Sequence, residues 1–464
     1  MPWAIDFRSR SAGLARAGVI LAVTGLALAG CSRELILPGD RFDTRTPLEA
    51  TFDAANSRGD ATAPVEVVAT APRAAVPIRL PATRASTEWT HRNGDTQHVA
   101  GHPALGSPLS AIWATDIGAG DGRKHRISAA PVAGGGRIYT LDSRATVTAV
   151  DAASGQAVWS RDLTPTGDRE DDASGGGLAY ADGTLYVTTG FGRLHAIDAA
   201  SGAPRWEQML EAPTTTAPTV SGGRVYVVSN DAVARAIDTR NGKILWTLPG
   251  APNITSVVGG AGPALSGRNV ILPLPSGEIV AALRQTGIRV WNSSVSGERL
   301  GRAYTIFTGV TADPVIVGDT IYVGSPTGRL VALDAADGER IWTAREGAYG
   351  PVWPAGDSLF LVSDEARLVR LNARTGETIW AEQMPYFVND RPRRHRAITA
   401  HFGPVLAGGR LLVASDDGLI RGFDPASGQM IESVEIPGGA ASAPIVVNGV
   451  AYVLSTRGVL HAYR

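Results

Sequence analysis

The feature that most constrains the fold is an internal repeat. Two stretches of the sequence are closely similar, residues 192–206 (GRLHAIDAASGAPRW) and residues 328–342 (GRLVALDAADGERIW). Degenerate copies of them recur from about residue 87 to the end of the chain. Each copy combines a short alternating strand, a D-A-x-x-G turn and a tryptophan at a fixed distance. A repeat of this length is one structural unit, and its recurring residues serve packing first.

The repeats predict an all-β protein. Each unit alternates with period two over about four short strands, as at Val225 and Val227 against Tyr226 and Val228, with glycine at the hairpins. One four-stranded sheet cannot bury both faces alone, whereas a ring of eight buries each face against a neighbour. We therefore predict an eight-bladed β-propeller.

The last unit, APIVVNGVAYVLSTRGVLHAYR, stops after three strands. LSAIWATDI, near the start of the repeats, supplies a fourth strand with Trp113 in the register of the repeat tryptophan. We expect the ring to close by pairing of N- and C-terminal strands. The recurring tryptophans are interpreted as wedges between blades: Trp113, Trp159, Trp206, Trp246, Trp291, Trp342 and Trp380.

The N-terminus differs from the rest. Basic residues precede the apolar run AGVILAVTGLALAG, which is typical of a signal peptide over residues 1–30. Residues 31–86 carry scattered prolines and no period, which predicts an irregular tether before the propeller at 87–464. The formal net charge of -1 provides no global field to recruit nucleic acid.

Two resemblances follow from these residues. Leu28-Ala29-Gly30-Cys31 resembles the lipobox of bacterial lipoproteins, and Cys31 is the only cysteine. Because Ser32 follows rather than aspartate, this resemblance implies lipid anchoring at Cys31 on the periplasmic face of the outer membrane. The repeats, with WTHRNGDTQHVAGHPAL before them, resemble the PQQ-type β-propeller repeat and, within that superfamily, the BamB family of outer-membrane assembly lipoproteins.

The BamB resemblance implies a non-catalytic scaffold that docks on the barrel-assembly protein BamA and helps deliver unfolded outer-membrane proteins. By repeat register, the docking segments correspond to NITSVVGG (253–260) and YTIFTGVTAD (304–313), where the family's arginine and aspartates are mostly absent. The candidate contact positions are Ile254, Val257, Val258, Phe307, Thr308, Gly309, Thr311 and Asp313.

Two alternatives stay open. A quinoprotein dehydrogenase of similar fold would bind PQQ and calcium, but the chain has no cysteine pair, and its one dense acidic run, GDREDD (167–172), falls in a connecting loop. A glycan-binding repeat protein has generic support only. The predicted scaffold therefore has no cofactor and no metal.

Three connections between blades are longer than a crossing requires: 160–176, 292–312 and 381–402. The third contains a basic run, Arg391 to Arg396. We expect Arg393 and Arg394 to contact an acidic surface, either protein or lipopolysaccharide.

Overall fold

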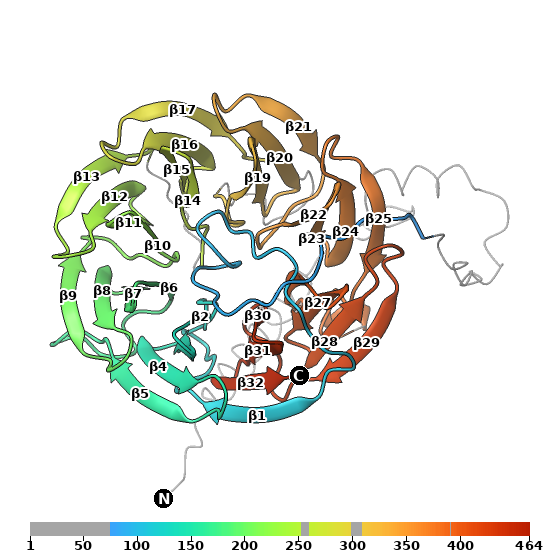
Figure 1. Ribbon diagram of the computed structural model, residues 1–464, viewed down its shortest axis with the longest axis horizontal. Helices are drawn as coiled ribbons and strands as arrows, with labels where there is room; N and C mark the ends of the chain where they lie inside the picture. The colour runs from blue at the N-terminus through green and yellow to red at the C-terminus, as the bar shows by residue number, and fades with distance from the viewer. Residues whose placement is uncertain (1–74, 252–258, 298–308, 390) are drawn as a thin grey trace, which may run out of the picture. The chain divides into compact units, whose positions relative to one another are not determined.

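Eight antiparallel four-stranded sheets form a ring in the computed structural model (Figure 1). The structure describes residues 75–251, 259–297, 309–389 and 391–464. The expected signal peptide, Cys31 and most of the expected tether lie outside these ranges. The sheets follow one another in chain order, so we number the blades 1 to 8 from β2 onward. The predicted eight-bladed propeller is confirmed.

Each blade has four strands, which follow one another from the centre of the ring to its rim (Figure 1). The innermost strands are β2 (Val132–Gly134), β6 (Gly176–Ala181), β10 (Thr219–Ser221), β14 (Ala264–Ser266), β18 (Val315–Val317), β22 (Trp353–Ala355), β26 (His401–Ala407) and β30 (Ile445–Val447). The second strands are β3 (Arg137–Leu141), β7 (Thr184–Thr189), β11 (Arg224–Val228), β15 (Asn269–Pro273), β19 (Thr320–Ser325), β23 (Ser358–Val362), β27 (Arg410–Ser415) and β31 (Val450–Leu454).

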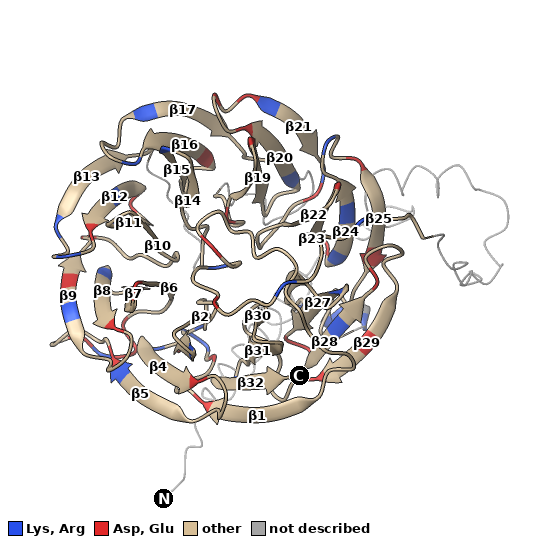
Figure 2. Cartoon of the chain, viewed as in Figure 1, with Lys and Arg blue, Asp and Glu red and all other residues tan. Residues whose placement is uncertain are grey.

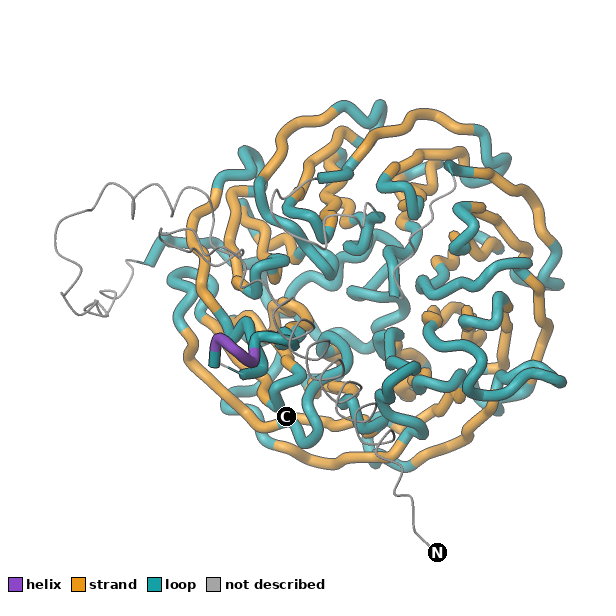
Figure 3. Tube along the Cα trace, turned by 180° about the vertical axis from the view of Figure 1, so that it is seen from behind, coloured by secondary structure: helices purple, strands orange, loops and turns teal. Residues whose placement is uncertain are grey.

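The third strands are β4 (Thr146–Asp151), β8 (Arg193–Asp198), β12 (Val233–Asp238), β16 (Glu278–Leu283), β20 (Arg329–Asp334), β24 (Arg367–Asn372), β28 (Leu419–Phe423) and β32 (Val459–Tyr463). The outermost strands are β5 (Ala157–Asp162), β9 (Pro204–Met209), β13 (Ile244–Pro249), β17 (Arg289–Ser294), β21 (Arg340–Ala344), β25 (Thr378–Gln383), β29 (Met430–Glu435) and β1 (Ala111–Asp116). Within the described ranges the one helical element is a 3-10 turn, η2 (Pro392–Arg394), which Figure 3 shows in purple.

The hydrophobic core lies between neighbouring blades. Side chains of blades 3 and 4, such as Tyr226 and Leu272, share one buried cluster, and the other clusters likewise join adjacent blades. The central positions of β4 are buried, whereas the rim strand β5 alternates between exposed and partly buried residues. Among the strands of the blades, Lys, Arg, Asp and Glu are accordingly absent from the innermost ones and occur on the second, third and outermost ones (Figure 2).

The ring closes as predicted. Strand β1 pairs with β32, and Trp113 lies opposite Ala462. Trp206 lies opposite Ala196 in the same way within blade 2. The N-terminal strand therefore completes blade 8 in the register of the other blades.

Each rim tryptophan packs against a glycine of the next blade. A Cβ on Gly202 would lie 2.7 Å from a ring carbon of Trp159, and Gly202 has φ of 73°. The Trp159 indole N–H donates to the carbonyl of Ala199 in the same turn, at 3.1 Å. Only glycine combines this positive φ with so close an approach. The pairing recurs as Trp113–Gly155, Trp206–Gly242, Trp246–Gly287, Trp291–Gly338, Trp342–Gly376 and Trp380–Gly428, so each of these tryptophans packs against the next blade.

The eighth junction is built differently. Glu432 of β29 lies opposite Gly422 of β28, at the position that a tryptophan occupies in the other blades. Its Oε1 accepts the Leu109 N–H at 2.5 Å, and its Oε2 lies 2.6 Å from Arg410 Nε. In blade 8 the paired strands β32 and β1 come from distant parts of the chain and are not joined by a hairpin, so blade 8 has no turn glycine to receive a tryptophan. A carboxylate that bonds the entering backbone takes that role.

Residues 86–105, which we call the plug, cross the centre of the ring (blue in Figure 1). Plug residues bond all eight blades in order: Asn448 N to Ser86 O, Trp89 N to Ala133 O, Tyr180 N to Thr90 O, Val220 N to His91 Nε2, Leu265 N to Thr96 O, Ile316 N to Gln97 O, Trp353 Nε1 to Gly101 O, and Gly408 N to Pro103 O. The plug therefore ties the inner edges of the blades together.

Part of the expected tether also lies on the ring. Residues 75–86 are described, and the guanidinium of Arg370 in blade 6 donates to the carbonyls of Val76 and Pro77, at 2.7 and 3.2 Å. Val76 N donates to Ala426 O of blade 7 at 3.1 Å. Arg370 is 1% exposed. The chain thus reaches the plug across blades 6 and 7.

The Trp–Gly contact predicts a specific sensitivity to a single methyl group. Gly376→Ala places a Cβ 2.6 Å from Trp342 and keeps an unfavourable φ of 74°. Gly183→Ala is the matched control, because Gly183 has φ of 70° and no atom within 4 Å of the added Cβ. In chemical denaturation we expect a loss of about 1 kcal/mol for Gly183→Ala and about 3 kcal/mol for Gly376→Ala. Equal losses would show that the wedge contact carries no stability.

The plug also predicts a pH dependence of stability. His91 is buried, accepts the Val220 N–H, and has its pKa lowered by burial, and less so by His98, from 6.5 to about 3. The folded state therefore holds the neutral ring, and stability is lost as pH falls below the pKa of the unfolded chain. Denaturation at about pH 5 and about pH 7.5 should differ by about 2 kcal/mol more in the wild type than in His91→Gln. A wild-type difference no larger than that of the variant would contradict this role.

Candidate interaction face

The two faces of the ring carry different connections between strands. One face carries the turns that join the first to the second and the third to the fourth strand of each blade; we call it the turn face. The other carries the loops between second and third strands and the links between blades, such as 163–175, 295–314 and 384–400; we call it the connection face. Long connecting segments on a rigid scaffold commonly carry recognition, so the connection face is the candidate site.

A cavity of 610 Å³ lies on the connection-face side of the plug. Trp89 and Arg92 of the plug line it, together with Tyr349, Tyr386 and Phe402 from links and the start of β26. Its volume falls within the range of small-molecule sites. Its aromatic side chains make it suited to a partly apolar occupant.

Two titratable groups of this cavity are already bonded within the protein. The His401 Nδ1 lies 2.7 Å from Ser415 Oγ and its Nε2 lies 2.8 Å from the Pro385 carbonyl, and burial lowers the pKa of His401. Asp416 accepts the Ala400 N–H at 2.9 Å, and burial raises the pKa of its carboxyl group. These groups fix the walls of the cavity.

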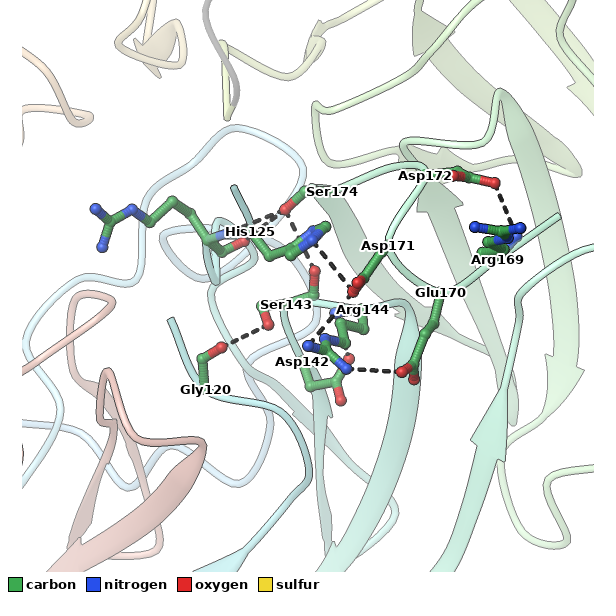
Figure 4. Close-up of polar contacts among 11 residues, drawn as sticks. Gly120, His125, Asp142, Ser143, Arg144, Arg169, Glu170, Asp171, Asp172 and Ser174 are labelled. Atoms are coloured by element: carbon green, nitrogen blue, oxygen red, sulfur yellow. Dashed lines mark hydrogen bonds and ion pairs between the residues drawn. The ribbon is translucent and has the colours of Figure 1, made fainter. Parts of the chain in front are cut away.

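The acidic run 167–172 lies in link 163–175, and two of its carboxylates have partners in neighbouring loops (Figure 4). Arg144 Nη1 lies 2.7 Å from Glu170, and its Nη2 lies 3.3 Å from Asp171. His125 Nε2 also lies 3.3 Å from Asp171. Glu170 and Asp171 are therefore already engaged by residues outside the link.

Arg144 is itself held in place by Asp142. This carboxylate accepts the backbone N–H groups of Ala119, Arg144 and Thr146, each at 2.8 Å. Burial raises the pKa of Asp142 despite these bonds. The loop between β3 and β4 is thereby rigid where it meets the acidic link.

These pairings do not suit a calcium site. Calcium takes six to eight oxygen ligands, including carboxylates, whereas Glu170 and Asp171 of the acidic link are already paired with Arg144 and His125. In the part of the chain that the structure describes, no three His, Cys, Asp or Glu side chains are grouped to hold a metal ion.

The described part also contains no helix of the length and apolarity needed to cross a membrane.

The candidate docking positions fall into two groups. Ile254, Val257, Val258, Phe307 and Thr308 lie outside the described residues. Gly309, Thr311 and Asp313 lie at the end of link 295–314, just before β18. The structure therefore places these three on the connection face, in the link between blades 4 and 5.

Thr311 and Asp313 are buried and serve the ring. The Thr311 hydroxyl donates to the Ala348 carbonyl at 3.0 Å. Asp313 lies 3.0 Å from Arg92 Nε of the plug and accepts the Gly262 N–H. With a fully buried side chain, Asp313 has no surface to offer a partner, so it holds the base of the link. Sequence register did not reveal this pairing, because Arg92 lies 221 positions away.

Arg393 and Arg394 are exposed at η2, within link 384–400. Sequence reasoning identified this basic run but not its neighbours Arg123, Lys124 and Arg457, which are also exposed on the connection face. These cations lie in three separate links and loops of the sequence, and only the ring topology brings them to one side of the cavity.

The sequence matches the family described as "Outer membrane protein assembly factor BamB" over residues 143–382 and 389–464. A relative of that name from Yersinia pestis is 23% identical over 357 residues, which cover 76% of this chain and 88% of the relative. Another from Moranella endobia is 25% identical over 244 residues, which cover 51% of this chain and 63% of that relative. The chain therefore spans just under two thirds of one relative and most of the other.

Two solved structures show the same fold. The crystal structure of BamB from Moraxella catarrhalis has a TM-score of 0.63 and 21% identity, covering 77% of this chain and 99% of that chain. A quinohemoprotein alcohol dehydrogenase from Comamonas testosteroni has a TM-score of 0.62 and 16% identity, covering 81% of this chain and 80% of that chain. At such identities the likeness shows the fold alone.

The internal role of Asp313 is directly testable. Asp313→Ala leaves Arg92 and the Gly262 N–H without their acceptor, and we expect a loss of about 3 kcal/mol in the free energy of unfolding. Asp319→Ala, an exposed aspartate in the β18–β19 turn of the same blade, is the control and should change stability by less than about 0.5 kcal/mol. Similar, small losses for both variants would contradict the internal role of Asp313.

Proposed function

Because the chain belongs to the outer membrane protein assembly factor BamB family, we propose that it is a non-catalytic scaffold of outer-membrane β-barrel assembly. The family match, which runs through most of the ring, is the observation that carries this proposal. We further propose that the chain is lipid-anchored at Cys31 on the periplasmic face of the outer membrane. Cys31 and the signal peptide before it rest on the sequence pattern.

The proposed partner is a BamA-like barrel-assembly protein, docked on the connection face at the links between blades 3, 4 and 5. Gly309, Thr311 and Asp313 support this site indirectly. The bonds of Thr311 and Asp313 fix the point from which link 295–314 leaves the ring. The proposed contacts themselves are Ile254, Val257, Val258, Phe307, Thr308 and Gly309. These residues are largely apolar, so the docking surface should be apolar at its centre.

Unfolded outer-membrane proteins are the proposed clients. The rim strands present an unpaired edge and exposed aliphatic side chains, such as Val158 (44% exposed), Ile341 (52%) and Ile431 (59%). An extended segment can add to such an edge through main-chain hydrogen bonds. This proposal predicts that client segments crosslink to rim strands during barrel assembly.

The second candidate is a quinone-dependent dehydrogenase. It is favoured by the likeness in fold to the Comamonas testosteroni enzyme and by the 610 Å³ cavity. The polar groups that line that cavity do not fit a calcium-bound quinone, because they are bonded within the protein: His401 and Asp416 as described, Asp121 to Arg126 and the Ile127 N–H, and Asp364 to the Gly347 N–H. We therefore propose that the protein is not an enzyme.

Docking is tested by recovery of the BamA-like protein with the membrane-extracted, tagged chain. Val257→Asp with Val258→Asp places charges in the proposed apolar contact, and recovery should fall about tenfold. Leu245→Asp is the control, because Leu245 is 45% exposed on the rim strand β13, away from the links. Recovery that is unchanged by the double variant would contradict docking through these links.

A titration of the same purified protein with PQQ and calcium separates the two candidates. We expect no saturable change in the quinone absorbance. A saturable signal without recovery of the BamA-like protein would replace the scaffold with the enzyme.

A further inference from the structure

Residues 384–400, which we call the finger, form a folded projection between blades 6 and 7. Val388 N donates to Ala397 O at 3.1 Å, and Thr399 N donates to Tyr386 O at 2.9 Å, so the two sides of the finger are paired. The Phe387 ring stacks on His395 with centroids 3.8 Å apart and planes 6° apart. The finger is therefore a built element with η2 at its end (Figure 3).

The end of the finger is strongly cationic. Arg391, Arg393, Arg394 and Arg396 are exposed, and none of their guanidinium groups forms a hydrogen bond or ion pair with another described residue, although the Arg391 backbone N–H donates to Asn389 Oδ1 at 3.1 Å. Residues 389–396 contain these four arginines and one acid, Asp390, which gives 4 − 1 = +3. Other arginines of this face are paired, as Arg421 is with Asp417 at 2.6 Å. The finger instead presents its guanidinium groups to solvent.

Three further cations surround the same part of the face. Arg123 and Lys124 lie in the link from blade 8 to blade 1, and Arg457 lies in the loop between β31 and β32. The cavity connects these segments, since Ile398 of the finger, Arg126 and Thr456 all line it. The finger and these three residues form what we call the cationic sector, across blades 7, 8 and 1.

The finger also exposes aliphatic side chains beside its charges. Val388 is 66% exposed and Ile398 is 50% exposed, and they lie on opposite sides of the paired hairpin. Arginines that flank exposed aliphatic residues on one projection suit a surface that offers phosphates and, just beneath them, hydrocarbon. A folded acidic protein would satisfy the arginines but would leave two exposed aliphatic side chains on the paired stem of the finger uncovered.

We propose that the cationic sector binds the surface of a bilayer containing anionic phospholipids, with the finger entering the headgroup layer. The arginines bind lipid phosphates, and Val388 and Ile398 pack at the boundary of the acyl chains. This contact turns the connection face toward the membrane on the side of blades 7, 8 and 1. The links between blades 3, 4 and 5 lie on the other side of the face, so the proposal does not depend on the proposed function.

The test is co-sedimentation of the full chain, carrying Cys31→Ala to prevent acylation, with lipid vesicles. Vesicles of phosphatidylcholine alone are compared with vesicles in which about one third of the lipid is phosphatidylglycerol. The N-terminal segment is common to all variants, so its contribution to vesicle binding is the same in each and does not affect the comparison between them. At about 100 mM salt, where the screening length is about 10 Å, we expect the wild type to prefer anionic vesicles.

Arg393→Glu with Arg394→Glu should lower the partition into anionic vesicles by about tenfold or more, because each basic residue near such a surface raises the partition about fivefold. The matched control is Arg374→Glu with Lys243→Glu, which reverses two exposed charges on the turn face and should change partition by less than about twofold. Val388→Ser with Ile398→Ser should lower partition by about threefold while the arginines remain.

Equal partition of the wild type and the Arg393→Glu, Arg394→Glu variant would overturn the proposal, as would an equal loss in the turn-face control. If charge reversal leaves vesicle binding unchanged but abolishes a crosslink to an acidic protein in the envelope, the cationic sector is a protein-docking surface and the lipid proposal is wrong. No BamA-like protein is present in the vesicle assay, so failure of vesicle binding is distinguishable from failure of the scaffold proposal.

Discussion

The structure depends on the contact between a rim tryptophan of one blade and a turn glycine of the next. Trp159 fits against Gly202 only because Gly202 has no Cβ and adopts a positive φ. The indole N–H then bonds the carbonyl of Ala199 in the same turn. A blade that lacked either partner would lose both the packed ring and the hydrogen bond, so tryptophan and glycine recur together. The spacing of this pair is what the repeat encodes.

The junction between blades 7 and 8 shows what happens when the receiving turn is missing. The two ends of the chain meet within blade 8, and Glu432 stands in the place of a tryptophan to bond Leu109 N and Arg410. The plug adds a second closure, because it bonds each blade at least once on its way around the centre. Together these contacts give a ring that is held at the rim by aromatic packing and at the centre by backbone hydrogen bonds.

The sequence was sufficient to predict the blades and their closure, because hydrophobic alternation and the tryptophan register are local signals. Trp113 shows this, since it was assigned to blade 8 across almost the whole chain. The plug was not predicted, because it binds mainly through backbone groups that carry no sequence signature. The pairing of Arg144 with Glu170 and of Arg92 with Asp313 was missed for a related reason: only the folded ring brings those distant residues together.

The central functional claim is that a barrel-assembly partner docks on the connection face. Gly309 lies in the link just before β18, and Asp319 is exposed in the β18–β19 turn of the same blade, on the turn face. A photoactivatable amino acid placed at each position in turn, in the native membrane complex, therefore reports which face the partner contacts. The account predicts crosslinks to the BamA-like protein from position 309 and few or none from position 319. Crosslinks concentrated at position 319 would place the partner on the turn face and contradict the account.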